Sequence, residues 1–420
     1  MKNQADTAAS HGSPPARTVN ADVVIIGGAL VGGTLAAALG QAGMVVAVVE
    51  AADPKAVTDA TFDGRASAIA LSSRRLLEGI GVWDLLRNTA APMLDIRVAD
   101  AGSPLYLHYR HDEVGDEPFG HMVENTRMRQ ALIARMAALP SVTLMAPQRC
   151  VRLDRSATRV RADLADGTVI RAPLAVAADG RNSPTRDGAG IDILQWRYDQ
   201  IAIVCTVVHE RPHNFVACEH FLPAGPFAIL PLLGNRSSIV WTERADLAPR
   251  IMALDDAGFT RELRRRFGDH LGTVEPVGPR WSYPLCWHLA ETAVAERLAL
   301  VGDAYHGMHP IAGQGLNMGL RDVAALAEVV TDAFRLGLDW GAPDILDRYQ
   351  RWRRFDNILM LGLTDGLNRL FSNDIVPIKL ARDAGLAMVN QMGPLKRLFM
   401  RHAMGVVGEL PRLMQGGRAL

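Results

Sequence analysis

The clearest candidates for binding chemistry are a glycine-rich turn and the acidic residue that follows it along the chain. Residues 27–32 read Gly-Gly-Ala-Leu-Val-Gly, which matches G-x-G-x-x-G except that Ala29 replaces the second glycine. Gly27 permits a tight turn, and Gly32 lets a helix pack closely on a strand. The amides around Gly28 and Ala29 can approach a pyrophosphate at a helix N-terminus. Glu50 lies where a carboxylate accepts hydrogen bonds from a ribose, so the pattern predicts a dinucleotide site.

The stretch around this turn predicts the elements that must position it. Length alone would allow a transmembrane helix from Val23 to Val49. The stretch is instead divided, because a β-branched run ends at Gly27, a helix-prone segment stops at Gly43, and a second β-branched run ends on Glu50. This order predicts a βαβ unit whose strands are buried on both faces. A βαβ unit without a ligand is the alternative interpretation.

Two further apolar runs end in a glycine paired with an aspartate. One run ends at Asp179-Gly180 and the other at Gly302-Asp303, and each predicts a buried strand. A glycine-containing loop follows Asp303 and leads into a helix predicted from about Met318 to Arg335. A loop of this kind can present backbone amides to an electron-rich ring or to an anion.

Together these segments resemble the FAD-dependent aromatic hydroxylases (class A flavoprotein monooxygenases), whose signatures are the GxGxxG turn, a DG motif and a GD motif. The resemblance is closer to the hydroxylases of ubiquinone biosynthesis and runs in order from about residue 20 to the C-terminus. The segments that carry it are 64–71, 81–83, 120–125, 302–306, 313–317, 370–372 and 403–405. The sequence departs from the family pattern at Ala29 and at Tyr305, where alanine is usual. Neither change removes a group with a chemical role, although Ala29 would lower the affinity for the cofactor.

The resemblance implies how the matching residues would hold FAD. The glycine-rich turn would face the pyrophosphate, and Glu50 would bind the adenosine ribose. Asp303 would hydrogen-bond to the ribityl chain. The residues that would pass over the isoalloxazine ring, with amides near its carbonyl edge, are Pro310, Gly313, Gln314, Gly315, Leu316 and Asn317.

Two of the implied roles have a structural alternative. Arg65 would neutralise the diphosphate or lie beside the flavin, but it could equally be a surface arginine. Asp179 and Gly180 would serve both FAD and the passing nicotinamide donor. The alternative for Asp179 is a helix cap or a turn, a role that can coexist with the first.

The reaction that the resemblance implies is hydroxylation of an electron-rich aromatic ring. NAD(P)H or an electron-transfer protein would reduce the flavin, O2 would react with it, and a C4a-hydroperoxide would transfer the hydroxyl group. No catalytic side chain is assigned, because the sequence has no G-x-S-x-G, H-E-x-x-H or paired-carboxylate motif. His306 and His309 are three positions apart without a further ligand cluster, so no metal is expected. The sequence lacks a second complete dinucleotide fingerprint, so the reductant is expected to bind transiently or to be a protein.

The expected fold is α/β: a Rossmann-like FAD-binding domain with an inserted, mainly antiparallel β-sheet substrate domain and a helical C-terminal region. The inserted part is recognised by a strand at 200–207, a hairpin of 227–232 with 238–242, and a helix at 258–267. The expected parts are a disordered tail (1–20), the FAD-binding domain (21–94, 121–190 and 291–343), the substrate domain (95–120 and 191–290) and C-terminal helices (344–420).

Composition narrows the class of protein. The 420 residues include 45 Lys+Arg and 45 Asp+Glu, so no global field attracts polyphosphate and nucleic acid is not expected as a partner. The 49% hydrophobic content can bury a large core. The four cysteines are scattered without a C-x-x-C, and the N-terminal segment lacks an apolar signal core. Both features favour a reducing, cytoplasmic location.

The charge is unevenly distributed along the chain. Residues 344–420 carry 12 Lys+Arg against 7 acidic residues, together with recurring apolar faces. Such helices can bind a membrane surface or a partner protein. The alternative is a helical cap packed on the FAD-binding domain. The resemblance favours the first interpretation. An enzyme with a prenylated substrate would benefit from contact with a membrane or with other ubiquinone-biosynthesis proteins.

The sequence thus predicts an FAD-dependent monooxygenase that hydroxylates the ring of a polyprenylated phenol in ubiquinone biosynthesis. Two alternatives stay open at this point. The chain could hydroxylate a soluble aromatic acid, or it could be a non-catalytic scaffold subunit.

Overall fold

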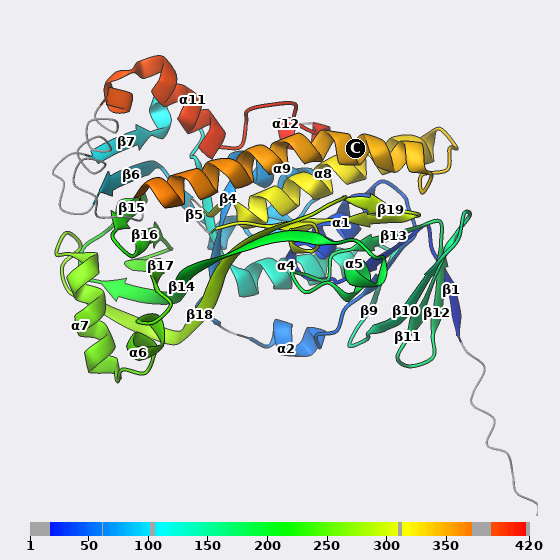
Figure 1. Ribbon diagram of the computed structural model, residues 1–420, viewed down its shortest axis with the longest axis horizontal. Helices are drawn as coiled ribbons and strands as arrows, with labels where there is room; N and C mark the ends of the chain where they lie inside the picture. Colours follow the sequence, from blue (N-terminus) through cyan, green and yellow to red (C-terminus); the bar gives the residue numbers. More distant parts are fainter. Residues whose placement is uncertain (1–16, 61, 101–105, 310–312, 372–387, 417–420) are drawn as a thin grey trace, which may run out of the picture.

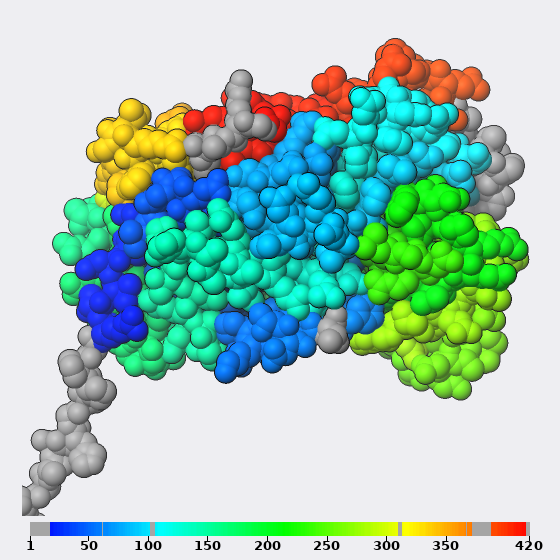
Figure 2. All heavy atoms as spheres, turned by 180° about the vertical axis from the view of Figure 1, so that it is seen from behind, coloured from blue at the N-terminus to red at the C-terminus, as the bar shows by residue number. Residues whose placement is uncertain are grey.

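The computed structural model describes residues 17–60, 62–100, 106–309, 313–371 and 388–416. They form an elongated α/β molecule with a parallel sheet toward one end and an antiparallel sheet toward the other (Figure 1). Seen from behind, the N-terminal strand and the green segment of the inserted sheet lie at opposite ends (Figure 2). This arrangement agrees with the α/β class and the inserted domain expected from the sequence.

The six-stranded sheet contains the predicted βαβ unit, and its pairings are parallel except that of β19 with β20. Its six strands lie in the order β19-β20-β13-β2-β3-β9. The strands are β2 (Val23–Ile26), β3 (Val46–Val49), β9 (Val142–Met145), β13 (Leu174–Ala177), β19 (Val294–Ala295) and β20 (Leu298–Leu300). Helix α1 (Leu30–Gln41) joins β2 to β3, and every residue of these two strands is buried. Val23–Val49 is therefore strand, helix and strand, as the glycine positions predicted.

The inserted sheet has eight strands in the order β21-β18-β14-β17-β16-β15-β6-β7. All its pairings are antiparallel except β15 with β6. Its strands are β6 (Asp95–Asp100), β7 (Tyr106–Arg110), β14 (Ile193–His209), β15 (Val216–Leu222), β16 (Gly225–Pro231), β17 (Arg236–Arg244), β18 (Val274–Ala290) and β21 (His306–Gly307). The predicted hairpin is β16–β17, and the predicted helix at 258–267 is α7 (Asp256–Phe267). Helices α6 (Ala248–Met252) and α7 build a second hydrophobic core on one face of this sheet.

Two smaller sheets extend the nucleotide-binding part. One has the order β4-β8-β5, and the other has the order β1-β12-β11-β10. Their strands are β1 (Thr18–Asn20), β4 (Ala66–Ala70), β5 (Ala91–Met93), β8 (Gly120–Glu124), β10 (Cys150–Arg155), β11 (Val160–Leu164) and β12 (Val169–Ala172). The prediction of a disordered tail over 1–20 is therefore wrong for 18–20, because β1 pairs with β12 in parallel. Residues 1–16 lie outside the described part.

Helices cover the upper side of the molecule in Figure 1. Helix α8 (Gln314–Arg335) packs on α1, and α9 (Pro343–Phe371) packs on α8. Helices α11 (Gly393–Ala403) and α12 (Arg412–Gln415) follow, so the described part of the C-terminal region is largely helical, as predicted. The predicted start of α8 near Met318 is wrong, because the helix begins at Gln314. Gly313 at φ +62° supplies the left-handed turn that allows this earlier start.

Candidate active site

The glycine-rich turn is held by close backbone packing. A Cβ atom on Gly32 would lie 1.8 Å from the Gly27 carbonyl oxygen, and one on Gly27, at φ +100°, would lie 2.3 Å from the carbonyl oxygen of Ala178. Only glycine fits at both positions, which explains the spacing seen in the sequence. Ala29 is exposed at the N-cap of α1 and lines the large cavity described below. Its methyl group is thus compatible with the local fold.

Glu50 lies at the end of β3, beside this turn. One carboxylate oxygen accepts a hydrogen bond from the Gly28 amide at 2.7 Å, and the other accepts one from the Ala52 amide at 2.7 Å. Gly28 is buried, so its amide is taken up by the hydrogen bond to Glu50. The acidic residue therefore ties the turn to the second strand.

The two residues of the DG motif have different surroundings. Asp179 accepts hydrogen bonds from the Ser183 hydroxyl and, at 3.1 Å, from the Thr185 amide at the start of α5 (Pro184–Gly188). Ser183 is the N-cap of α5, and Asp179 supports this cap from the turn before the helix. Gly180 lies at φ +85° and lines the cavity, and a Cβ atom on it would meet no atom within 4 Å.

The GD motif presents one carboxylate to the cavity and is anchored by another. Asp303 is exposed and lines the cavity, whereas Gly302 and Ala304 beside it are buried. Asp322 of α8 is fully buried and accepts hydrogen bonds from the Gly302 amide at 3.0 Å and from Arg353 Nε at 2.8 Å.

A third group completes the anchor around Asp322. The ring Nε2 of His306 lies 2.6 Å from the Asp322 carboxylate. Burial alone would raise the pKa of Asp322, but His306 and Arg353 bring this pKa below its usual value. The ionised carboxylate thus joins the motif, α8 and α9.

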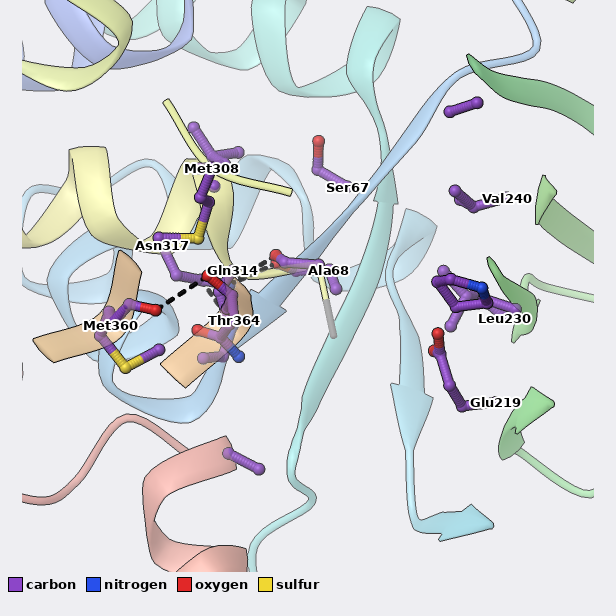
Figure 3. Close-up of a pocket in the computed structure, with 18 of the residues that line it drawn as sticks. Ser67, Ala68, Glu219, Leu230, Val240, Met308, Gln314, Asn317, Met360 and Thr364 are labelled. Carbon is purple, nitrogen blue, oxygen red and sulfur yellow. Dashed lines mark hydrogen bonds between the residues drawn. The ribbon is translucent and has the colours of Figure 1, made fainter. Parts of the chain in front are cut away.

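The first turn of α8 lies beneath the cavity. Gly313, Gln314, Gly315 and Leu316 line it, and a Cβ atom on Gly315 would meet no atom within 4 Å. Asn317 donates to the Ala68 carbonyl at 2.9 Å and accepts from the Ala70 amide at 2.9 Å, so it ties α8 to β4 (Figure 3). The predicted residue Pro310 lies outside the described residues.

Arg65 also lines the cavity, where its guanidinium group is held from two sides. Its Nη2 and Nε lie 2.7 and 3.1 Å from Asp63 Oδ2. The guanidinium carbon lies 4.9 Å from the centre of the Trp281 ring. The side chain is partly buried, so Arg65 is an oriented cation at the cavity wall and not a freely solvated surface residue.

These groups converge on one cavity of about 1570 Å³. Ligand sites are commonly ~300–1,000 Å³, so this cavity has room for a dinucleotide and a second molecule. The residues of the predicted site that line it are Ala29, Arg65, Gly180, Asp303, Gly313, Gln314, Gly315, Leu316 and Asn317. Gly27, Gly28, Gly32, Glu50, Asp179 and Gly302 shape the turns behind this lining.

The lining residues fit FAD in their chemistry. The open backbone at Gly180 and Gly315 allows a planar or charged group to approach closely. The N-termini of α1 and α8 can face an anion, Asp303 can accept hydrogen bonds from hydroxyl groups, and Arg65 supplies positive charge.

The far side of the cavity is one face of the inserted sheet. Apolar side chains from β14, β17, β16, β15, β6 and β7 line it, among them Val204, Val240, Leu230, Phe221, Val98 and Leu107. Helices α9 and α11 close it from the other side, with Met360, Leu363 and Phe399. Figure 3 shows Leu230 and Val240 opposite Gln314 and Met360, with Ser67 and Ala68 between them.

Sequence reasoning missed two carboxylates. Asp322 follows the GD motif within α8, where nothing in the apolar pattern distinguishes it from a surface acid. Glu219 projects from β15 into the apolar side of the cavity (Figure 3). Burial raises the pKa of Glu219 to about 7. A carboxylate amid apolar positions of the strand 216–222 was the available signal.

His306 and His309 have separate environments. His306 is bound to Asp322, whereas His309 is fully buried with the ring of Tyr198 against it at 5.2 Å. Burial lowers the pKa of His309 to about 4. Among the described residues, no group of three or more His, Cys, Asp or Glu side chains is arranged to hold a metal ion.

Comparison with known proteins identifies relatives of the whole chain. Residues 20–356 match a family described as FAD binding domain. The chain is 59% identical over 399 residues to the ubiquinone hydroxylase UbiL of Rhodospirillum rubrum, covering 94% of this chain and 93% of the relative. It is 36% identical over 386 residues to the 3-demethoxyubiquinol 3-hydroxylase of Escherichia coli, covering 92% and 98%.

A solved structure supports the fold assignment. The p-nitrophenol 4-monooxygenase PnpA of Pseudomonas putida superposes with a TM-score of 0.76 at 21% identity, covering 96% of this chain and 100% of that chain. At this identity, the likeness establishes the fold. The matches over nearly the whole length show that the chain belongs to the FAD-dependent aromatic-ring monooxygenases, in the family of the ubiquinone hydroxylases.

Proposed function

We propose that this monooxygenase hydroxylates the ring of a polyprenylated phenol in ubiquinone biosynthesis. The observation that carries the proposal is the single cavity that joins the nucleotide-binding motifs to the apolar face of the inserted sheet. A soluble aromatic acid would need a cation beside its carboxylate. The sheet face offers instead an extended apolar surface suited to a prenyl chain.

The predicted binding residues that line the cavity would act on FAD directly, and those behind the lining would shape the turns that hold it. Asp303, which is exposed at the cavity, would accept hydrogen bonds from the ribityl hydroxyl groups, and Arg65 would stabilise the diphosphate or the flavin ring. The amides of the first turn of α8, around Gly315, would face the isoalloxazine edge. When bound, FAD takes electrons from NAD(P)H and activates O2 for transfer of one oxygen atom. The protein supplies orientation and excludes water from the ring.

The prenyl tail enters between α9 and α11. Leu363 and Leu370 of α9 and Leu398 and Phe399 of α11 line the cavity, and each keeps 43–47% of its surface exposed to solvent. We place the mouth of the cavity at these exposed lining side chains. Deeper in, Phe221 of β15 stacks on Phe371 of α9 with ring centres 4.1 Å apart. This apolar passage can hold isoprene units.

The mouth faces a lipid bilayer in this proposal. Phe355 and Leu359 continue the exposed apolar stripe of α9 toward the mouth, at 71% and 41% exposure. Arg397 and Arg401 of α11 are exposed and lie close to Leu398 and Phe399 in the sequence, where they can contact anionic headgroups. No helix within the described ranges is long and apolar enough to cross a membrane. The contact that we propose is with the bilayer surface.

Product analysis tests the substrate directly. In a strain without this gene, we expect a prenylated phenol to accumulate and ubiquinone to fall. Purified protein with FAD, NAD(P)H or an electron-transfer protein, and O2 should hydroxylate the accumulated phenol. Unaltered ubiquinone in the deletion strain would contradict the proposal, and turnover of soluble aromatic acids alone would favour the other substrate class. Protein that binds FAD but yields no oxygen-dependent product would indicate a scaffold.

A further inference from the structure

Glu219 is an acidic side chain on an otherwise apolar part of the cavity wall. It belongs to β15, where it pairs with Ala228 of β16 on one side and Val98 of β6 on the other. All three line the cavity. Along β15, Ala217 and Phe221 flank Glu219 at the alternate positions that share its face of the sheet. The carboxylate is therefore set between a small residue and the aromatic side chain that stacks on Phe371.

The Glu219 side chain is partly buried in the cavity wall and has no partner among the described residues. Among the described residues it makes no hydrogen bond or ion pair, and burial is the sole cause of its raised pKa. The titratable side chains that line the cavity on the elements around it are Tyr109 of β7, Cys218 of β15 and His402 of α11. Burial raises the pKa of Tyr109 to about 12 and that of Cys218 to about 11, so both stay neutral near pH 7.

Unpaired carboxylates in apolar surroundings are costly and are uncommon without a function. A purely structural role would require a hydrogen-bond donor or a cation, and the described residues provide neither. The partner that Glu219 lacks is thus a donor that arrives with a ligand. In a cavity that takes a phenol, the ring hydroxyl group is such a donor.

We propose that Glu219 accepts the proton of the substrate's ring hydroxyl group and so activates the ring for hydroxylation. This inference rests on the proposed function, because it assumes a phenolic substrate. Glu219 would fix the ring in the cavity, and the Phe221–Phe371 pair beyond it would receive the start of the tail. The residue is then a catalytic group in direct contact with the substrate.

Every proton in this proposed step has a donor and an acceptor. The O–H bond of the phenol breaks, an O–H bond forms on the Glu219 carboxylate, and the electron pair stays on the ring oxygen, where it enriches the ring. After the ring carbon has gained its oxygen atom and released its hydrogen as a proton to water, Glu219 returns its proton to the original ring oxygen. The oxidant and reductant are the O2 and NAD(P)H of the established activity.

The acidity of Glu219 suits this task. A base is most effective when its pKa lies near the working pH, and burial raises the pKa of Glu219 from 4.5 to about 7. The pKa of phenols lies near 10, so a base of ordinary carboxylate strength would be poorly matched.

The test compares Glu219→Gln with the matched control Glu275→Gln. Glu275 is an exposed carboxylate on β18 of the same sheet. We expect the wild-type kcat to fall below about pH 7 and Glu219→Gln to lose both this pH limb and about 10²-fold in kcat. FAD content and the rate of flavin reduction should be unchanged, and Glu275→Gln should behave as wild type. A Glu219→Gln enzyme with wild-type kcat and the same pH limb would overturn the inference.

A second readout separates this inference from the proposed function. If wild-type protein hydroxylates no prenylated phenol, the proposed function fails, and Glu219 can still be examined with a bound nitrophenol, whose visible absorbance reports ionisation. A lower ionised fraction of bound nitrophenol in Glu219→Gln than in wild type and Glu275→Gln would support proton acceptance. Equal fractions in all three proteins would overturn it.

Discussion

Asp303 differs from its neighbours in the GD motif because its side chain is exposed toward the cavity. We expect Asp303→Ala to lose FAD, since a buried ribityl hydroxyl group would have no acceptor. A lost hydrogen bond of this kind costs about 1–3 kcal/mol, or roughly 5- to 150-fold in the Kd for FAD. Absorbance of the purified protein and titration with FAD measure the effect. Asp303→Asn retains an acceptor and should bind FAD more tightly than Asp303→Ala. Full flavin loading of the alanine variant would contradict the role of Asp303.

Glu219 should also make the free energy of unfolding depend on pH. The dependence should run in the opposite direction to that of a carboxylate held in an ion pair. The pKa of Glu219 is raised from 4.5 to about 7 in the fold, so the folded protein holds this proton more tightly than the unfolded chain does. Glu219 therefore does not change the free energy of unfolding below about pH 4.5. Between about pH 4.5 and pH 7 it lowers this free energy progressively, and above about pH 7 the full reduction is present. The full cost is on the order of 3 kcal/mol, because each unit of pKa difference between the folded and unfolded states corresponds to about 1.4 kcal/mol.

Thermal unfolding of Glu219→Gln at two pH values checks this sign. Since glutamine carries no charge to bury, we expect a higher Tm than wild type at pH about 8 and nearly equal Tm values at pH about 5. Glu275→Gln again serves as the control and should match wild type at both. A stabilisation of Glu219→Gln that is the same at both pH values would show that burial of charge is not its cause. Stability gained with activity lost is the pattern expected of a functional residue.

At the scale of elements, α8 and α9 are joined through the buried Asp322. Its carboxylate binds Arg353 of α9, His306 and the Gly302 amide together. Asp322→Ala would leave the Arg353 guanidinium buried without its main counter-charge. Breaking a buried pair in this way costs about 3–5 kcal/mol, so we expect a large fall in Tm and displacement of the GD motif with loss of FAD.

An exposed ion pair provides the comparison for Asp322. Asp246 bonds to Arg244 at 2.9 Å at the surface of the inserted sheet, and both side chains are more than half exposed. Asp246→Ala should change stability by less than about 1 kcal/mol. Differential scanning fluorimetry with excess FAD measures the Tm of both variants and of wild type. An Asp322→Ala protein with a Tm as close to wild type as that of Asp246→Ala would rule out Asp322 as the anchor.

Elements whose signals are local could be predicted from the sequence, and those that depend on distant partners could not. The βαβ unit is punctuated by glycines that its own packing requires, and the β16–β17 hairpin surrounds its own turn. Strand β1 forms because it pairs with β12, some 150 positions further along the chain. Its own composition gives no strand signal and predicted a disordered tail. The start of α8 was misplaced because Gly313 and Gly315 suggest a loop, whereas Gly313 is the left-handed residue that precedes the helix.

The same distinction applies to the site. The motif residues were found because their spacing reflects local turns around a nucleotide. Glu219 and Asp322 were not, since their importance arises from a sheet face and a helix pair assembled from distant segments. The roles of the motif residues toward FAD remain predictions that the variants above test.

At the scale of the whole molecule, the balanced net charge conceals a basic C-terminal segment. Residues 344–420 hold 12 Lys+Arg against 7 acidic residues, within a chain whose totals are 45 and 45. Leu363 and Leu370 of α9 and Leu398 and Phe399 of α11 are exposed and also line the cavity, so we propose that the cavity opens between these two helices, beside the basic residues of α11. This coincidence of apolar surface, positive charge and opening is the basis for expecting contact with a bilayer.

Sedimentation with vesicles of phosphatidylglycerol and phosphatidylcholine tests this contact. We expect wild-type protein to pellet with the vesicles and to be partly released by high salt, because part of the attraction is electrostatic. The double variant Phe355→Asp/Leu359→Asp should bind at least about 10-fold more weakly, since each apolar side chain contributes roughly 1.5–3 kcal/mol when buried. The control is Leu336→Asp/Leu338→Asp, which alters side chains exposed by 74% and 49% just beyond the end of α8. Equal pelleting of the two double variants would mean that the α9 stripe does not contact lipid.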